Sequence, residues 1–423
     1  MSNFNLVMTR NIYLILGYLM TPEINNCTVV EELQGFEGVE KRIEIRFSAS
    51  YSNNEGLRGI DRITWDEICS KCKCEIIHYE PQDCFDSYIL SESSLFVFST
   101  KVMMKTCGTT VPLDSVDLIV KAASVMGMFP LEMIYSRSDY MFPLMQPVPY
   151  NSFASEINHL AKMEIAGSVI PGKSSILESS NGRHWFVHRK VWNDGSSTPR
   201  GESMDQLLPS QVAVDIIMTG LCASSRKLYY QDPLLSSEEN HENMRKAMSM
   251  VLPEFKSIVG KCFEPCGYSC NAHQAINDDY SNRYATVHVT PEAEFSYASV
   301  EVVFNLPYLM RDISPNDDTR SWSVETNQLI NEIQSCVERT IAHFNPKTYM
   351  VNILSSSTDV SATTLMKSKP HVKIFEKHEK TLHTQFPEAY TSENLLGEDL
   401  VASSVFYSNV SSGNTGTKPT GLS

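Results

Sequence analysis

Alternating apolar and polar residues recur along the chain and predict β-strands. The runs at residues 43–47, 285–289 and 300–304 would turn their apolar side chains to one face of a sheet and their polar side chains to the other. We therefore expect largely antiparallel sheet structure with one covered face. Two shorter apolar runs, at 88–90 and 95–98, are separated only by Ser-Glu-Ser-Ser, a polar insert without glycine or proline.

Three segments have the periodicity of helices that cover a sheet. They lie at residues 115–128, 152–163 and 323–344. In the third segment the apolar residues fall on one stripe, which consists of Ile330, Ile333, Val337, Ile341 and Phe344. Strands and helices follow one another without a regular βαβ order, which favours a layered α+β fold over a doubly wound parallel sheet.

Composition indicates where regular structure should be absent. Residues 1–35 contain an apolar run of about ten residues, too short to span a bilayer and without a signal-peptide cleavage site, so we expect a poorly constrained extension. The stretches 181–203 and 355–369 have the polar composition of loops, and 411–423 that of a disordered tail. One late strand is expected at 400–407.

The charge and the cysteine content narrow the classes of partner. The chain has 35 basic and 50 acidic residues, a formal net charge of −15, which argues against nucleic acid and tolerates cationic ligands. Eleven cysteines are too few for a disulfide framework in 423 residues and indicate reduced thiols. The clusters at 69–74 and 262–270 lack the paired spacing of a zinc site. We expect a cytoplasmic protein without a metal site or a membrane span.

Five stretches set unusual polar residues within an apolar, strand-like context. They are FEGVEK at 36–41, LSESS at 90–94, KTCGTT at 105–110, FEPCGYS at 263–269 and HVTPE at 288–292. Taken singly, each has an ordinary structural explanation. Glu37 and Glu40 suit solvated strand ends, Cys107 suits a small buried hydrophobic position, and His288 suits a hydrogen-bonded core histidine.

Taken together and in this order, the five stretches resemble the eukaryotic S-adenosylmethionine decarboxylase proenzymes, a pyruvoyl-dependent family. The resemblance covers roughly residues 36–355 and extends more faintly to about 410. It implies one domain at 36–410, built as an αββα sandwich of two largely antiparallel sheets flanked by helices. The implied reaction converts S-adenosylmethionine to S-adenosylmethioninamine and carbon dioxide, for spermidine and spermine biosynthesis.

The resemblance also implies that the chain cuts itself between Glu92 and Ser93. The Ser93 hydroxyl would attack the preceding carbonyl, and loss of the Cα proton would then break the resulting ester and lead to a pyruvoyl group. A strained turn would favour this, because cleavage relieves the strain. Ser269 and His288 match the residues that assist processing, and His288 is suited to remove a proton near neutral pH.

In the mature enzyme the pyruvoyl group made from Ser93 would hold the substrate amine as a Schiff base, so that no metal or external cofactor is implied. Cys107 matches the proton donor, with a thiol pKa expected near the working pH. Glu37, Glu40 and Glu92 match further active-site positions. Because Glu37 and Glu40 are three residues apart in a predicted strand, we expect a bend or bulge at Gly38 if both serve the site.

The substrate has a flat adenine, a ribose diol and a sulfonium cation, which call for aromatic faces and a carboxylate. By resemblance, Phe36 and Phe263 stack the adenine from either side. Glu292 accepts hydrogen bonds from the ribose, and Glu92 lies in the same substrate site.

Some members of this family bind the dication putrescine as an activator in a buried acidic cluster. Glu44 and Glu301 match two of those acids, and Asp215 is a candidate for a third. Gln211 stands where an acid would be expected, and one missing carboxylate would weaken the binding of a buried dication. Activation by putrescine is therefore left open. The formation of a homodimer is also left open, because dimer formation varies within the family. Neighbouring polar positions are matched by Lys41, Lys105, Ser136 and Arg137.

Two other functions need to be separated from decarboxylation. A non-catalytic regulatory paralogue that binds an active decarboxylase subunit should have lost at least one of the matched processing and catalytic residues, but all of them are present. A nucleotide-type binding domain without chemistry would keep the substrate positions but would not need the Glu92-Ser93 pair.

Overall fold

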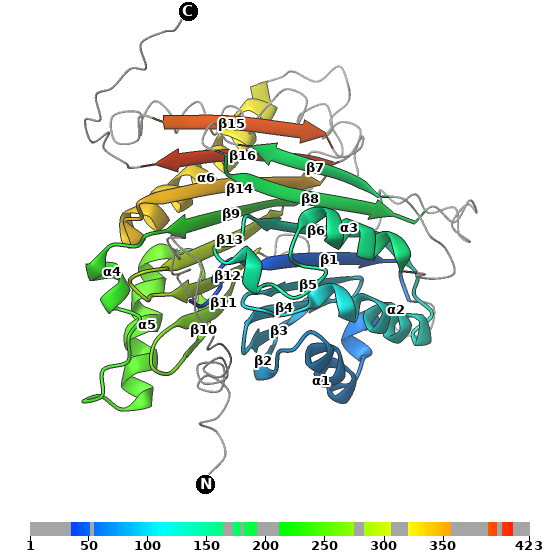
Figure 1. Cartoon of the computed structure of the whole chain (residues 1–423), viewed down its shortest axis with the longest axis horizontal. Coiled ribbons are helices and arrows are strands. Elements are labelled where there is room, and N and C mark those ends of the chain that lie inside the picture. Colours follow the sequence, from blue (N-terminus) through cyan, green and yellow to red (C-terminus); the bar gives the residue numbers. More distant parts are fainter. Residues whose placement is uncertain are drawn as a thin grey trace, which may run out of the picture. The chain divides into compact units, whose positions relative to one another are not determined.

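Two antiparallel sheets of eight strands each organise the described part of the chain (Figure 1). They belong to one compact unit that starts at Gly35. The computed structural model describes residues 35–50, 55–163, 172–178, 182–192, 211–274, 283–305, 320–356, 388–395 and 400–408.

The first sheet has the strand order β2-β3-β4-β5-β1-β6-β8-β7, and helices pack on its outer face (Figure 1). In β1, Ile43, Ile45 and Phe47 join an apolar cluster with Trp65 of α1 and Ile119 of α2. The strands are β1 (Lys41–Phe47), β2 (Ile76–Pro81), β3 (Phe85–Leu90), β4 (Ser93–Phe98), β5 (Lys101–Thr106), β6 (Pro130–Ser138), β7 (Lys173–Glu178) and β8 (His184–Val191). The helices are η1 (Gly56–Gly59), α1 (Arg62–Lys71), η2 (Pro112–Ser115), α2 (Val116–Val125), η3 (Pro143–Met145) and α3 (Phe153–Lys162).

The second sheet has the order β10-β11-β12-β13-β9-β14-β16-β15 and is covered by a second set of helices. Val214 and Ile216 of β9 pack with Met244 of α5 and with Ile333 and Val337 of α6. The strands are β9 (Gln211–Thr219), β10 (Ser257–Cys262), β11 (Tyr268–Gln274), β12 (Arg283–Thr290), β13 (Tyr297–Asn305), β14 (Thr348–Ser356), β15 (Glu388–Leu395) and β16 (Leu400–Ser408). The helices are α4 (Ala223–Lys227), α5 (Ser237–Val251) and α6 (Arg320–Phe344).

The inner faces of the two sheets meet through polar side chains as well as apolar ones. Arg42 of β1 donates to Glu301 of β13 over 2.8 Å, and Ser94 of β4 donates to Asn271 of β11 over 2.6 Å. The expectation of one covered face is therefore wrong, because the polar face of each central strand is covered by the other sheet. The expected αββα sandwich is confirmed.

The three expected helices correspond to α2, α3 and α6, whereas α1 and α5 lie outside them. Of the predicted stripe, Ile333, Val337, Ile341 and Phe344 are buried, and the side chain of Ile330 lies outside the described residues. The expected late strand is β16. None of the described helices combines the length and the apolar character needed to cross a bilayer.

Part of the expected loop at 181–203 is instead strand β8, because Trp185 and Val187 alternate with outward-facing residues and pack between the sheets. Ser355 and Ser356, expected in the next loop, end β14. The rest of these two stretches, from 193 and from 357, lies outside the described residues, as do 1–34 and 411–423.

Candidate active site

The polar insert between the first two strand-like runs is a tight turn that ends in a strained residue. Leu90 pairs with Ser93 across the β3–β4 hairpin, so that only Ser91 and Glu92 form the loop. Such loops usually require glycine for positive φ angles. Here Ser93 itself has a φ of 131°, a conformation that costs a non-glycine residue about 1–3 kcal/mol. The strain therefore falls on the residue that follows the Glu92-Ser93 bond.

The hydroxyl of Ser93 is buried and bound to a carboxylate. Its Oγ donates to Glu40 Oε1 over 2.5 Å, while Ser299 donates to the other carboxylate oxygen. Lys105 Nζ lies 3.3 Å from Glu40 Oε2. Burial alone would raise the pKa of Glu40, but Lys105 and the two hydroxyls hold it below its usual value. An ionised carboxylate thus accepts from Ser93.

Cys107 lies against the carbonyl of the same peptide bond. Its backbone N–H donates to Glu92 O over 2.9 Å, and its Sγ lies 3.4 Å from that oxygen. The Sγ is also 3.3 Å from Nε2 of His288. Burial, with Glu92 and Glu40 nearby, raises the pKa of the Cys107 thiol well above its usual value. In this intact chain Cys107 therefore keeps its proton, and the expectation of a thiol pKa near the working pH in the mature enzyme stays a prediction.

His288 connects Cys107 to Ser269. The two partners Ser269 and His288 face each other in the β11–β12 pair, and Ser269 Oγ lies 2.7 Å from His288 Nδ1. Burial lowers the pKa of His288, although Glu40 opposes this effect. The imidazole is therefore held in its neutral form, in which it can accept a proton.

Glu37 and Glu40 lie in the extended segment before β1, not in a strand. The expected bulge at Gly38 is therefore absent. Gly38 instead packs closely against Tyr297, since a Cβ atom at this position would lie 2.5 Å from that side chain. The Glu37 carboxylate accepts from the backbone N–H groups of Val39 and Phe142 over 3.0 and 2.8 Å. Burial raises the pKa of Glu37 despite these donors. Glu37 thus orders the segment, whereas Glu40 contacts Ser93.

Phe36 and Glu92 meet at Gly108, which has a φ of 64°. A Cβ atom at Gly108 would lie 3.1 Å from Glu92 Oε2 and 3.6 Å from Phe36 Cε2. Burial raises the pKa of Glu92 to about 7, despite the hydrogen bond from Cys107 and the charge of Lys41. Lys41 Nζ donates to Gly108 O over 2.8 Å and so fixes the same turn.

Phe263 and Glu292 lie at the end of β11 and β12 that also carries Ser269 and His288. The Phe263 N–H donates to Gly267 O over 3.0 Å and closes the turn between β10 and β11. Glu292 follows β12, and its Oε2 is buried without a hydrogen-bond partner. A carboxylate oxygen in that state calls for a donor from a ligand or from water.

The three acids of the expected putrescine site are already paired with basic side chains. Glu44 Oε2 lies 2.8 Å from Arg42, which also binds Glu301. Lys105 Nζ lies 2.8 Å from Asp215 Oδ1 and 3.3 Å from Glu301 Oε2. Of the neighbouring polar positions, Arg137 is bound to Glu156 and Gln211 accepts from Lys101, while Ser136 pairs with Arg42 in the strand register.

These contacts belong to a balanced network between the sheets. Its five carboxylates are those of Glu40, Glu44, Glu132, Asp215 and Glu301. Four of its basic groups form direct ion pairs with them, namely Arg42, Arg46, Lys105 and Arg189. The fifth basic group, Lys101, donates to Gln211 and Tyr284 and acts on Glu44 through its charge. The sequence motifs did not indicate Arg42 or Arg46. The signal that could have found them is Arg-x-Glu-x-Arg at 42–46, which puts all three side chains on one face of β1.

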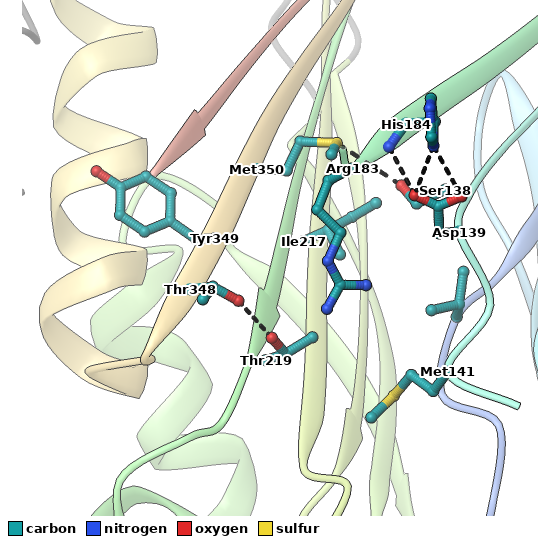
Figure 2. Close-up of a pocket in the computed structure, with 11 residues that line it drawn as sticks. Ser138, Asp139, Met141, Arg183, His184, Ile217, Thr219, Thr348, Tyr349 and Met350 are labelled. Carbon is teal, nitrogen blue, oxygen red and sulfur yellow. Dashed lines mark hydrogen bonds and ion pairs between the residues drawn. The ribbon is translucent and has the colours of Figure 1, made fainter. Parts of the chain in front are cut away.

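A small cavity is lined in part by Val39 of the Glu37–Glu40 segment, and Figure 2 shows its lining. Its volume of about 30 Å³ is room for one or two water molecules. Three pairs of its lining residues bind each other: His184 with Asp139, Ser138 with Met350, and Thr219 with Thr348 over 2.5 Å. Val39 forms the wall shared with the site. Among the described residues no group of His, Cys, Asp or Glu side chains has a metal-binding arrangement.

Comparisons with known proteins agree with the motifs. A family model described as adenosylmethionine decarboxylase matches residues 33–409. The S-adenosylmethionine decarboxylase proenzyme of Drosophila melanogaster is 29% identical over 334 residues, which cover 78% of this chain and 85% of that protein. Proenzyme 4 of Arabidopsis thaliana is 33% identical over 283 residues, which cover 65% and 77%. The crystal structure of the Trypanosoma brucei AdoMetDC-delta26 monomer matches with a TM-score of 0.46 and 19% identity, over 75% of this chain and 99% of that one.

Proposed function

The chain belongs to the adenosylmethionine decarboxylase family, and from this premise we propose that it is a self-processing, pyruvoyl-dependent decarboxylase of S-adenosylmethionine. One observation carries the proposal: the strained Ser93 places its hydroxyl 2.5 Å from the Glu40 carboxylate, next to the Cys107–His288–Ser269 chain. The products would be S-adenosylmethioninamine and carbon dioxide, and the former would serve spermidine and spermine synthesis.

The first processing step is an N-to-O acyl shift at the Glu92-Ser93 bond. Ser93 Oγ attacks the Glu92 carbonyl carbon and gives its proton to Glu40, which already accepts from it. The Cys107 N–H donates to the carbonyl oxygen and can stabilise the charge that develops there. The C–N bond then breaks, the Ser93 nitrogen takes up a proton, and an ester replaces the amide.

The second step removes the Cα proton of Ser93 and breaks the ester. Glu92 leaves as a free carboxylate, and the dehydroalanine that remains tautomerises and hydrolyses to a pyruvoyl group and ammonia. His288 is the proposed base, because it is neutral and Ser269 fixes its orientation over 2.7 Å. Ser93 fits the precursor of a pyruvoyl group, since it carries a hydroxyl, is fully buried and has a strained backbone.

In the mature enzyme this chain would bind the substrate, orient it and supply a proton. A pyruvoyl carbonyl supplies a group that condenses with an amine and takes up the electrons released as carbon dioxide leaves. Cys107 is the proposed proton donor, which agrees with a thiol that stays protonated. Phe36 and Phe263 are proposed to stack the adenine, and Glu292 to accept from the ribose through its unpartnered oxygen.

The non-catalytic paralogue is not favoured, because Ser93, Cys107, Ser269 and His288 are present and their contacts join in one cluster. The test is the intact mass of the freshly purified chain. We expect two polypeptides, residues 1–92 and a pyruvoyl-blocked chain that starts at position 93. A single uncleaved chain that releases no carbon dioxide from S-adenosylmethionine would overturn the proposal.

We further propose that putrescine is not needed as an activator, because the network of five carboxylates and five basic groups is already neutral. A diamine would add two buried positive charges without partners. The variant Arg42→Leu removes one internal cation and should lower the thermal stability, since breaking a buried ion pair costs about 3–5 kcal/mol. Putrescine should then restore part of that stability, as measured by thermal unfolding, and should leave the natural protein unchanged.

The matched control is Arg62→Leu, which breaks an exposed ion pair with Asp66 on α1. It should respond to putrescine as little as the natural protein does. Faster processing or a raised melting temperature of the natural chain in putrescine would contradict the proposal that the network is saturated.

A further inference from the structure

The segment Arg226–Gln231, which includes the end of α4, binds the turn that carries Phe263. Gly267 N donates to Tyr229 O over 2.9 Å, and Gln231 N donates to Pro265 O over 3.3 Å. The Gln231 side chain donates to Phe263 O over 3.1 Å. These bonds run along the whole turn, so that the segment sets the position of the Phe263 backbone.

The same segment also binds the chain just before Glu292. Arg226 Nη1 donates to Pro291 O over 3.4 Å, and the Tyr230 hydroxyl donates to the same oxygen over 3.5 Å. Tyr230 therefore stands between the two elements that bear the proposed adenine and ribose contacts. None of the five sequence motifs includes it.

The Tyr230 hydroxyl lies in a polar group with Cys266 and Glu292. Partial burial, the Cys266 thiol and the Glu292 carboxylate raise the pKa of Tyr230, so its hydroxyl stays protonated. Burial and Glu292 likewise raise the pKa of Cys266 to about 12. The group thus contains a neutral hydroxyl, a neutral thiol and the Glu292 carboxylate, whose Oε2 is buried without a partner. The Tyr230 side chain is 40% exposed, so it can still meet a ligand.

We propose that Tyr230 is a specificity-determining residue for the ribose of the substrate, and this inference rests on the proposed function. A ribose diol presents two groups that each donate and accept. The Glu292 carboxylate can only accept, whereas the Tyr230 hydroxyl can exchange its long bond to Pro291 O for one that it donates to a sugar oxygen. Together they would match a diol, and either alone would leave part of it without a partner.

The test compares ligand binding by Tyr230→Phe and by the natural processed protein. The probes are 5′-methylthioadenosine and its 2′,3′-dideoxy analogue, measured by calorimetry. One neutral hydrogen bond corresponds to a loss of about 3- to 10-fold in affinity. We expect this loss for the ribose ligand, little change for the dideoxy ligand, and a KM for S-adenosylmethionine raised by a similar factor at unchanged kcat.

Leu234→Ala is the matched control, because Leu234 follows in the same loop and is 91% exposed. It should leave both affinities and the KM unchanged. A second variant, Glu292→Gln, removes the other proposed partner of the diol, and the effect of Tyr230→Phe should shrink in its background because the two groups act on one ligand. A merely structural role for Tyr230 would instead weaken both probes equally.

The outcomes separate the two proposals. If the natural chain is not cleaved or does not bind 5′-methylthioadenosine, the proposed function and this inference both fail. If it is cleaved and binds, but Tyr230→Phe discriminates between ribose and dideoxyribose as well as the natural chain does, only the role of Tyr230 is overturned.

Discussion

Replacing Ser93 with alanine is expected to leave the chain whole and without decarboxylase activity. Without Oγ there is no nucleophile for the Glu92 carbonyl, and without an ester there is no route to the pyruvoyl group. The strained turn should persist, because Leu90 still pairs with position 93. Intact-mass analysis after long incubation should show one chain of full length, and carbon dioxide release should fall to background.

Ser94→Ala is the control for this variant. Ser94 is the next residue of β4, is equally buried, and donates to Asn271 instead of contacting Glu40. We expect its cleavage at Glu92-Ser93 to continue, with some loss of stability because the buried Asn271 Oδ1 loses the donor that Ser94 supplies. Cleavage of Ser93→Ala at the same bond would show that another group is the nucleophile.

Replacing Glu40 with glutamine is expected to slow self-processing by about 10²- to 10⁴-fold, the range typical of a lost general base. The amide can still lie beside Ser93 Oγ but does not take up its proton at neutral pH. Because the pKa of Glu40 is held below its usual value, the natural chain should keep this base ionised as the pH falls from neutral to mildly acidic. The measurement is the rate at which the full-length chain disappears, followed by mass at several pH values.

The matched control is Glu44→Gln, four residues along the same segment. Glu44 is buried and ion-paired with Arg42 and Arg46, but it does not contact Ser93. It should lose stability in thermal unfolding while it keeps cleavage within a few-fold of the natural rate. If the two variants process equally fast and both remain folded, Glu40 is not the base.

Much of the fold followed from the sequence, and the parts that did not share one cause. A period of two in β1, β12 and β13 predicted the strands and their two faces. It did not show what covers the polar face, because alternation is the same whether Arg42 and Glu44 meet water or another sheet. Likewise Trp185 and Val187 of β8 lie in a stretch whose glycine, serine and charge suggested a loop, and their burial depends on strands far away in the chain.

The sequence by itself determined the family and the residues of the candidate site. The motifs around Glu92-Ser93, Cys107 and His288 are short stretches that occur in the same order as in the family. The family model confirms the resemblance that they indicated.

Only the tertiary structure decided how these residues are paired. It binds Ser93 to Glu40 across 53 positions and Cys107 to His288 across 181, and it places Arg42 and Lys105 among the acids. The physical reason is that the packing of the two sheets decides which side chains become buried together. Burial and neighbouring charges then set the protonation state of each group.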